Sequence, residues 1–467
     1  MTKLIDQNTE YRRIPRLILA AAHSGSGKTM ISMGILAAFQ KRGLSIASYK
    51  CGPDYIDPMF HSRVLGLATR NLDTYFTDRE TTRMLFAQGQ PDGTELALIE
   101  GVMGYYDGAG LTTETGSTYE LAMTLDAPVV LIIDAAGMSL SVVAVLRGFL
   151  EHRKPSQIVG VLFNRMSKQV YEAIRPEVEA LGICPCGYVP KLPNMELPSR
   201  HLGLVTPEEL TDLKTYTEKL AAQIEESVDL EALLSLAYAA PEFTWKPMEL
   251  PRLSRPLSVS VAKDEAFCFL YEDNLNYLRR IGAHVQFFSP MHEERIPDKT
   301  DVLMLTGGYP ELYAEHLSAN INMLQSVRAA LEAGVYVLAE CGGFLYLTET
   351  LEDMEGHAYP MAGWIPAKAF QTKKLGRFGY VELTPKAGGE RIRGHEFHYF
   401  DTTDNGSGFI AKKPFRDVSW ECMHVSEQAL IGFPHLYYYS NPKFLAERLE
   451  LYIQVCESNG NRSLIYD

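Results

Sequence analysis

The chain has 467 residues, with a hydrophobic fraction of 46% and a charged fraction of 22%, as expected for a globular protein of two or three domains. Its formal net charge of −14 argues against general nucleic-acid binding, which requires a basic surface. Residues 127–133 form the longest apolar run, which is too short to span a membrane, and residues 1–13 lack a signal-peptide core. We therefore expect a cytoplasmic enzyme with small-molecule substrates and neither a nucleic-acid nor a membrane partner.

Apolar runs alternate with amphipathic stretches through the first part of the chain. A helix is expected from Thr29 to Arg42, because its apolar residues recur at helical spacing and Gly43 provides a stop. Strands that alternate with helices predict a parallel sheet with helices on both faces. The expected strands are Arg16–Ala21, Ser45–Tyr49, Leu96–Glu100, Pro128–Asp134 and Ile158–Phe163.

The run Ser24-Gly25-Ser26-Gly27-Lys28-Thr29 lies between the first strand and the first helix, which is the order that a P-loop requires. Backbone N–H groups of the turn and the positive end of the helix would face phosphate groups. Lys28 would reach the outer phosphates, and the Thr29 hydroxyl would ligate Mg²⁺. The full pattern has glycine where this chain has Ala22, so we expect a working loop with a slightly altered start. The alternative, a tight glycine turn that binds nothing, does not account for the lysine–threonine pair.

Acidic residues follow the ends of the expected strands. Glu100 comes directly after an apolar strand, where the Mg²⁺ partner of a P-loop often lies, and Asp54, Asp57 and Asp107 lie in neighbouring turns. Because ligands of open α/β sheets bind at the carboxyl ends of the strands, these acids are candidates for Mg²⁺ ligation or substrate positioning. For each of them, a capping or turn role is the alternative.

Several prolines between residues 191 and 250 flank a helical stretch at Tyr216–Leu236, which indicates the end of a domain, a helix and a linker. From Leu257 the strand–helix pattern restarts. The expected strands are Leu257–Ala262, His284–Phe288, Asp301–Leu305 and Val335–Ala339, and the expected helices are Asn274–Ile281 and Leu317–Ala333.

The strand Val335–Ala339 leads into Glu340-Cys341-Gly342-Gly343, and a helix-like segment follows. A sharp strand-to-helix turn would lift the Cys341 thiol clear of the sheet, where the next backbone N–H helps to hold an oxyanion. Gly342 would supply one such N–H, and Gly308, in a glycine turn after another strand, a second. A nucleophilic cysteine also needs a base. His435 is the candidate, with a buried structural histidine as the alternative.

His395-Glu396-Phe397-His398 invites a zinc interpretation, but the spacing differs from the helical motif in which the two histidines are four residues apart. The flanking residues favour a strand here.

Together these runs resemble those of the cobyrinic acid a,c-diamide synthase family, glutamine-dependent amidotransferases of corrin biosynthesis, over essentially the full length of the chain. The matching runs are residues 24–29, 50–58, 100–104, 200–204, 262–267, 307–311, 340–343 and 394–398. The resemblance implies an α/β protein. A P-loop amidoligase domain similar to dethiobiotin synthetase would span residues 1–200, a helix and linker residues 201–250, and a flavodoxin-like class I glutamine amidotransferase domain residues 251–467.

In the second domain, the resemblance implies that Cys341 attacks the glutamine side-chain amide with assistance from His435 and releases ammonia. Gly308 and Gly342 would form the oxyanion hole. The family usually lacks the acidic third member of the triad, and here His435 is followed by leucine and three tyrosines. The orientation of His435 is therefore left to other groups.

In the first domain, the resemblance implies that ATP phosphorylates a carboxylate of a tetrapyrrole and that ammonia displaces the phosphate to give an amide. Thr29 and Glu100 would hold Mg²⁺. Residues implied to bind ATP are Ser24, Gly25, Ser26, Gly27, Lys28, Thr29 and Asn164. Residues implied to face the substrate or intermediate are Asp54, Tyr55, Asp57 and Asp107.

The expected substrates are therefore ATP, glutamine and a tetrapyrrole polycarboxylate, with cobyrinic acid favoured and sirohydrochlorin, its nickel complex or sirohaem as alternatives. The resemblance leaves open whether the enzyme is a homodimer. Two other classes are weighed against it. A P-loop switch ATPase has no use for the Cys341 turn, and a tetrapyrrole carrier with a degenerate core has no use for the intact Lys28, Thr29 and Glu100.

Overall fold

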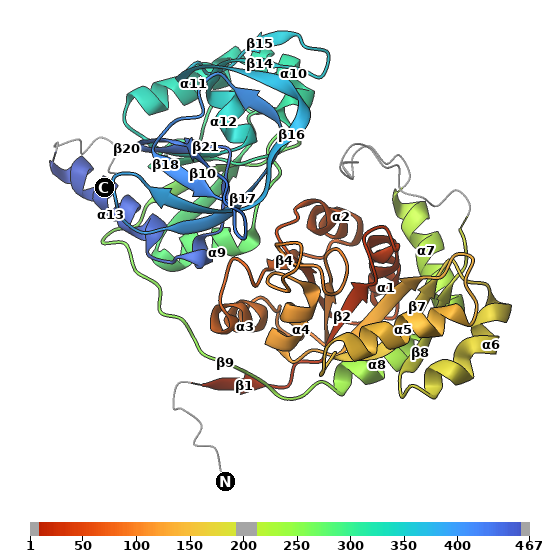
Figure 1. Cartoon of the computed structure of the whole chain (residues 1–467). Coiled ribbons are helices and arrows are strands. Elements are labelled where there is room, and N and C mark those ends of the chain that lie inside the picture. Colours follow the sequence, from red (N-terminus) through yellow and green to blue (C-terminus); the bar gives the residue numbers. More distant parts are fainter. Residues whose placement is uncertain (1–8, 193–212, 459–467) are drawn as a thin grey trace. The chain divides into compact units, whose positions relative to one another are not determined.

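The computed structural model describes residues 9–192 and 213–458, and the contacts divide the chain into unit 1, Met1–Met248, and unit 2, Glu249–Asp467 (Figure 1). The matched run at residues 200–204 lies outside the described residues. No helix in the described parts of the chain is long and apolar enough to cross a membrane.

Unit 1 is built on a parallel sheet with the strand order β4-β3-β5-β2-β6-β7-β8. Its strands are β2 (Arg16–Ala21), β3 (Ile46–Cys51), β4 (Thr69–Leu72), β5 (Leu96–Glu100), β6 (Val129–Asp134), β7 (Ile158–Asn164) and β8 (Cys184–Val189). Every residue of the central strands β2, β3 and β5 is buried, as expected for a sheet covered on both faces. A short ribbon of β1 (Glu10–Arg12) and β9 (Phe243–Trp245) pairs antiparallel beside it.

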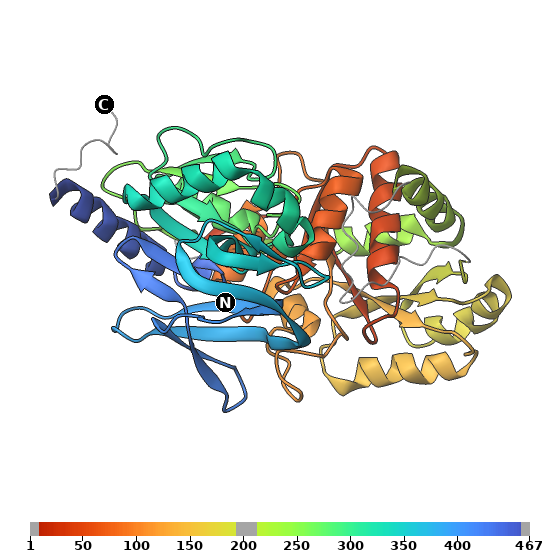
Figure 2. The ribbon, with the colours of Figure 1, turned by 90° about the horizontal axis from the view of Figure 1, so that it is seen from above.

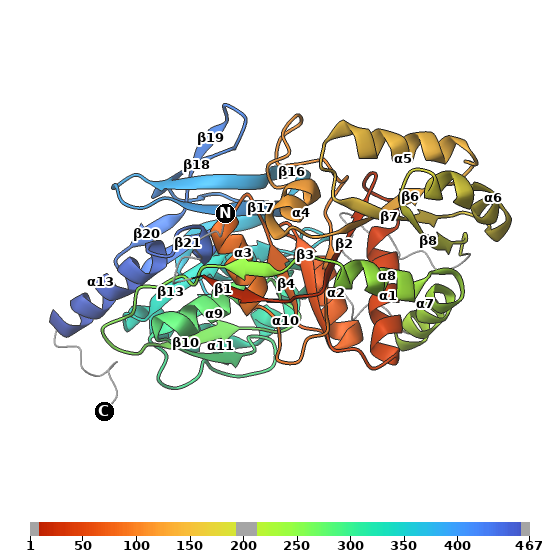
Figure 3. The ribbon, with the colours of Figure 1, turned by 90° about the horizontal axis from the view of Figure 1, so that it is seen from below.

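Helices cover both faces of this sheet. They are α1 (Lys28–Lys41), α2 (Ile56–Leu65), α3 (Arg79–Gln88), α4 (Thr118–Leu125), α5 (Ser141–His152), α6 (Lys168–Glu179), α7 (Leu213–Ser227) and α8 (Leu230–Tyr238). Figure 2 shows the strands between α1 and α7 on one side and the gold helix α5 on the other. Figure 3 shows that α8 covers the same face of the sheet as α1, and that α6 covers the same face as α5.

The strand predictions for unit 1 are confirmed, but the strands β1, β4, β8 and β9 and one helix boundary were missed. The edge strands β4 and β8 carry polar, glycine or proline residues and so lack the apolar runs of the central strands. The stretch predicted as one helix at Tyr216–Leu236 is two helices, because the Asp229 carboxylate accepts the Ala232 N–H at 2.9 Å and starts α8 anew. Both helices belong to unit 1.

Unit 2 contains a sheet with the order β11-β10-β12-β13-β21-β20, parallel except for β20 at its edge. Its strands are β10 (Ser258–Ala262), β11 (His284–Phe288), β12 (Val302–Leu305), β13 (Tyr336–Glu340), β20 (His424–Ser426) and β21 (Ala429–Gly432). The helical segments of the unit are α9 (Glu272–Ile281), η3 (Pro310–Tyr313), α10 (Ala314–Ala319), α11 (Ile321–Glu332), α12 (Gly342–Leu347), η4 (Tyr438–Ser440) and α13 (Phe444–Ser458).

The prediction of one continuous helix at Leu317–Ala333 is wrong, because the structure has two helices there, α10 and α11. Asn320 separates α10 from α11, since its side chain accepts the Met323 N–H at 3.4 Å and donates to the carbonyls of Pro290 and Glu293 at 2.9 and 2.8 Å. These bonds to a distant loop favour a break that helical periodicity alone does not reveal.

A further sheet of unit 2 was not predicted. Its order is β15-β14-β16-β17-β22, with β18 paired to β16 and β19 to β18, and the long antiparallel pair β16–β17 is prominent in Figure 1. Its strands are β14 (Thr348–Glu352), β15 (Ala358–Pro360), β16 (Ile365–Pro385), β17 (Ile392–Thr402), β18 (Phe409–Lys412), β19 (Ser419–Cys422) and β22 (His435–Leu436). The predicted strand at residues 395–398 is confirmed as part of β17.

Candidate active sites

The phosphate loop in unit 1 adopts the backbone that its glycines allow. Gly25 and Gly27 have φ angles of 80° and 86°, a region that favours glycine, and α1 begins directly after Gly27. The Asn164 amide donates to the Ser26 carbonyl at 2.9 Å, and a Cβ on Gly27 would lie 2.2 Å from that amide nitrogen. Asn164 thus supports the loop from the end of β7. The N–H groups at the start of α1 make this loop a site for anions.

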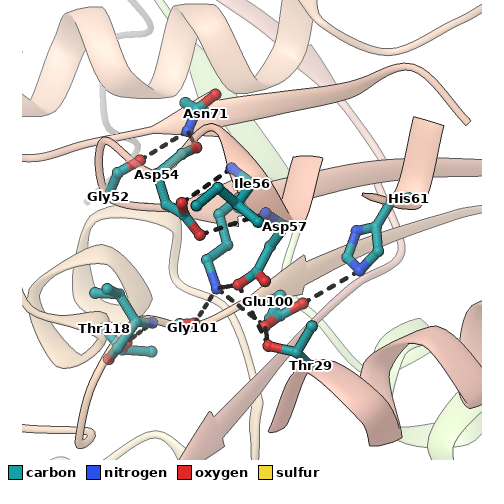
Figure 4. Close-up of polar contacts among 12 residues, drawn as sticks. Thr29, Gly52, Asp54, Ile56, Asp57, His61, Asn71, Glu100, Gly101 and Thr118 are labelled. Carbon is teal, nitrogen blue, oxygen red and sulfur yellow. Dashed lines mark hydrogen bonds and ion pairs between the residues drawn. The ribbon is translucent and has the colours of Figure 1, made fainter. Parts of the chain in front are cut away.

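Beside the loop lies a cluster of charged side chains, here called the lysine–carboxylate cluster: Lys50, Asp57 and Glu100. The Thr29 hydroxyl reaches it, donating to Glu100 Oε1 at 2.8 Å and to Asp57 Oδ2 at 3.3 Å. Figure 4 shows the side chains of Thr29, Asp57 and Glu100 converging on one point. The structure therefore brings together three of the residues predicted for Mg²⁺ and substrate.

Lys50 was not predicted as a site residue, yet it is central to the cluster. Its ammonium group donates to Glu100 Oε1 at 2.9 Å and to the Gly101 carbonyl at 3.2 Å, and it forms an ion pair with Asp57. The register of β3 and β5 places Lys50 directly beside Glu100. A lysine within an otherwise apolar buried strand was the sequence signal that could have identified it.

The cluster separates the pKa values of its members. Burial would lower the pKa of Lys50, but Asp57 and Glu100 raise it above its ordinary value. Burial would raise the pKa of Glu100, but Lys50 and His61 hold it well below its ordinary value. Burial raises the pKa of Asp57 to about 8 despite Lys50. Burial and the neighbouring Lys50 lower the pKa of Lys28. Lys50 and Glu100 are therefore the charged pair.

His61 is a second residue that sequence reasoning missed. It is fully buried in α2, with Nε2 3.3 Å from Glu100 Oε2 and Nδ1 3.4 Å from the Ser48 hydroxyl. Figure 4 shows the His61 ring pointing at Glu100. His61 thus orients the Glu100 carboxylate, while the other oxygen of that carboxylate faces Thr29 and Lys50.

The remaining predicted substrate residues lie in turns near the cluster. Asp54 accepts the N–H groups of Ile56 and Asp57 at 3.0 and 3.4 Å, and Asp107 accepts the Gly104 N–H at 3.0 Å. Tyr55 is buried at the start of α2. The two carboxylates stabilise their own turns, and their contacts to a substrate stay predictions.

The oxygen atoms of Thr29 and Glu100 fit Mg²⁺, which typically takes one or two protein oxygens and completes its shell with phosphates and water. Their separation of 2.8 Å places both donors on one side of such an ion. In residues 9–192 and 213–458, no group of three or more histidine, cysteine, aspartate or glutamate side chains could hold a metal ion by itself.

Cys341 in unit 2 occupies a strained turn. It follows β13 with φ 47° and ψ −104°, a left-handed conformation unusual for a residue other than glycine, and α12 begins at the next residue. Its N–H donates to the Gly432 carbonyl at 2.8 Å, which ties the turn to β21. Burial raises the pKa of the Cys341 thiol, and Glu311 raises it further, so the thiol needs a base to react.

The predicted oxyanion donors lie against each other. A Cβ on Gly342 would be 3.0 Å from the Gly308 nitrogen and 2.8 Å from the Pro310 ring. A Cβ on Gly308 would be 2.1 Å from the Ala266 carbonyl oxygen. Both positions therefore require glycine on steric grounds, and the close approach puts the Gly308 nitrogen beside Gly342, the residue after Cys341.

His435 lies on β22, which pairs with β17 so that His435 and His395 are partners. The two rings stack with centroids 5.0 Å apart, and a Cβ on Gly307 would lie 2.3 Å from Cε1 of His435. Burial, with His395 and His398 nearby, holds the pKa of His435 well below its ordinary value. His435 is therefore neutral at neutral pH, as a base must be before it takes a proton.

Known protein families match both units. A CobQ/CobB/MinD/ParA nucleotide binding domain matches residues 17–205, and a CobB/CobQ-like glutamine amidotransferase domain matches residues 258–417.

Curated relatives match nearly the whole chain, and each of the following is named cobyrinate a,c-diamide synthase. The chain is 37% identical over 457 residues to the protein of Caldanaerobacter subterraneus subsp. tengcongensis, covering 95% of this chain and 99% of that protein. It is 38% identical over 442 residues to that of Salmonella typhimurium, covering 92% and 96%. It is 37% identical over 440 residues to that of Listeria monocytogenes serotype 4b, covering 91% and 97%.

Gly307 offers a steric test of the His435 position. In Gly307→Ala the added Cβ would displace the His435 ring, so glutamine hydrolysis should fall on the order of 10²-fold, as for other small misplacements of a reacting group. Amidation supported by ammonium should remain. Gly148→Ala is the matched control, because a Cβ there meets nothing within 4 Å. Unchanged hydrolysis of glutamine by Gly307→Ala would contradict a base at His435.

Proposed function

Because the chain belongs to the cobyrinate a,c-diamide synthase family of glutamine-dependent amidotransferases, we propose that it converts cobyrinic acid to its a,c-diamide, using ATP and ammonia from glutamine. The observation that carries this proposal is the pair of sites on one chain: a phosphate loop beside buried carboxylates in unit 1, and a cysteine turn and a buried, neutral histidine in unit 2. A switch ATPase would need only the first site.

The thiol site supports release of ammonia. His435 takes the proton from the Cys341 Sγ, and the thiolate attacks the side-chain carbonyl carbon of glutamine. The N–H groups of Gly342 and Gly308 stabilise the negative charge on the carbonyl oxygen. His435 then returns the proton to the departing nitrogen, which leaves as ammonia. Water hydrolyses the thioester to give glutamate and restores the thiol.

The phosphate site supports activation of a carboxylate. The nucleotide binding domain implies the use of ATP. The substrate carboxylate attacks the γ-phosphorus, ADP leaves, and an acyl phosphate forms. Ammonia then attacks the acyl carbon and phosphate departs, which gives the amide. Without this activation the carboxylate would have to expel an oxide ion, a very poor leaving group.

The lysines of this site offset the negative charge that the transferring phosphate concentrates. Lys28, the first residue of α1, reaches the outer phosphates, and Lys50 lies between Asp57 and Glu100. Thr29 and Glu100 would hold Mg²⁺, which would neutralise charge on the phosphates of ATP. The low pKa of Glu100 keeps its carboxylate charged for that role.

The proposal is tested by offering ATP, Mg²⁺ and glutamine with each tetrapyrrole in parallel: cobyrinic acid, sirohydrochlorin, nickel-sirohydrochlorin and sirohaem. Mass spectrometry counts the amides added to each ring. We expect two amides on each cobyrinic acid molecule and one ADP for each amide formed. Diamide formation mainly on a sirohydrochlorin or on sirohaem would support the proposed reaction but contradict cobyrinic acid as the substrate.

Cys341→Ser should abolish glutamine-dependent amidation, because a serine hydroxyl in this buried turn is a far weaker nucleophile than the thiolate. Amidation from ammonium should continue at close to the wild-type rate. The measurement is amide formation with each nitrogen source, with unfolding followed by circular dichroism. Retained use of glutamine would rule out Cys341 as the nucleophile.

Lys28→Ala should remove activity with either nitrogen source, by about two orders of magnitude or more, because the lost charge acts on the phosphoryl group in both cases. ADP release is the measurement. Lys41→Ala, an exposed lysine at the end of the same helix, is the control and should retain activity. Equal activity of the two variants would argue against the P-loop role of Lys28.

A further inference from the structure

The environment of His435 contains an acid that comes from another strand. Glu340 Oε2 lies 3.8 Å from His435 Nδ1, and both side chains are almost completely buried. The chain after His435 continues as leucine and three tyrosines and offers no acid. This carboxyl group comes from the end of β13, one residue before Cys341.

The fold explains how Glu340 reaches His435. In the parallel pair β13–β21, Glu340 is in register with Gly432, three residues before His435. Glu340 Oε1 accepts the Leu436 N–H at 3.2 Å, so the carboxyl group is anchored to the residue that follows the histidine. One oxygen therefore binds the backbone of β22, and the other faces the imidazole.

We propose that Glu340 is the positioning residue for His435, taking the place of the acidic third member of a catalytic triad. Oε2 faces Nδ1, which leaves Nε2 as the nitrogen that receives the Cys341 proton. The inference rests on the proposed function of the thiol site. Glu340 and Cys341 are adjacent in the sequence, so one strand supplies the nucleophile and the group that orients its base.

A negative charge on Glu340 would also stabilise the positive charge that His435 gains when it takes the thiol proton. Moving the thiol proton to His435 creates an imidazolium in a buried site, which is costly without a facing negative charge. Burial raises the pKa of Glu340 to about 8, although the hydrogen bond from the Leu436 N–H lowers it. The other groups against this pair are His395 and His398 of β17 and Tyr438 of η4.

Glu340→Gln separates positioning by the acid from a purely structural role. The amide oxygen of glutamine can still accept the Leu436 N–H, but the side chain can no longer carry the negative charge. We expect kcat for glutamine hydrolysis to fall by about two orders of magnitude with little change in KM. Amidation from ammonium should be unchanged. Glu427→Gln, an exposed glutamate in the same unit, is the matched control.

The second readout is the pH dependence of Cys341 alkylation by iodoacetamide, followed by peptide mass spectrometry. Loss of the carboxylate should raise the pH of half-maximal alkylation by about one unit or more, as expected for removal of a nearby opposite charge from an imidazolium. If Glu340→Gln has the same kcat and the same pH profile of alkylation as the wild type, the inference is overturned. The proposal that Cys341 is the nucleophile would not be affected. Equal losses with glutamine and ammonium would also overturn it, by showing that Glu340 only supports the fold.

Discussion

Both sites depend on one constraint: parallel strands end at the same edge of their sheet. Side chains that directly follow such strands are brought together whatever their distance in the sequence. In unit 1 the constraint places Lys50 of β3 beside Glu100 of β5, and the phosphate loop follows β2 between β5 and β6. In unit 2 it places Cys341, after β13, beside the end of β21.

Confinement of charge in a buried site carries a thermodynamic cost, which the pairing of Lys50 with two carboxylates offsets. Removal of one partner from a buried pair typically destabilises a protein by about 3–5 kcal/mol, since it leaves an uncompensated charge. Its shared oxygen, Glu100 Oε1, receives both the Thr29 hydroxyl and the Lys50 ammonium. The same oxygen is suited to bind a cation, so the atom that pairs with Lys50 in the fold is also the proposed Mg²⁺ ligand.

The thiol site is built differently, because His435, the proposed base, lies on β22 and not on a strand of the parallel sheet. The antiparallel pairing of β17 with β22 holds His435 against His395, and the glycines at 307 and 394 let the backbones approach closely. A Cβ on Gly394 would lie 2.2 Å from the His435 carbonyl oxygen. The sheet of β14 to β22 therefore fixes the position of His435, the proposed base.

The sequence by itself determined the two-unit α/β class, the phosphate loop and the cysteine turn. Each of these is a local pattern: an apolar strand, a short run of glycine and polar residues, and a helix. Tertiary structure alone decided which distant side chains meet them. Lys50 carried a local signal, a lysine within a strand, but its partners, like those of His61 and Glu340, are not visible in the sequence. Their roles come from strand register and from packing between residues far apart in the chain, such as Glu340 and Leu436. Local propensity and periodicity report on one strand or helix at a time, whereas buried charges are paired only when the sheets assemble.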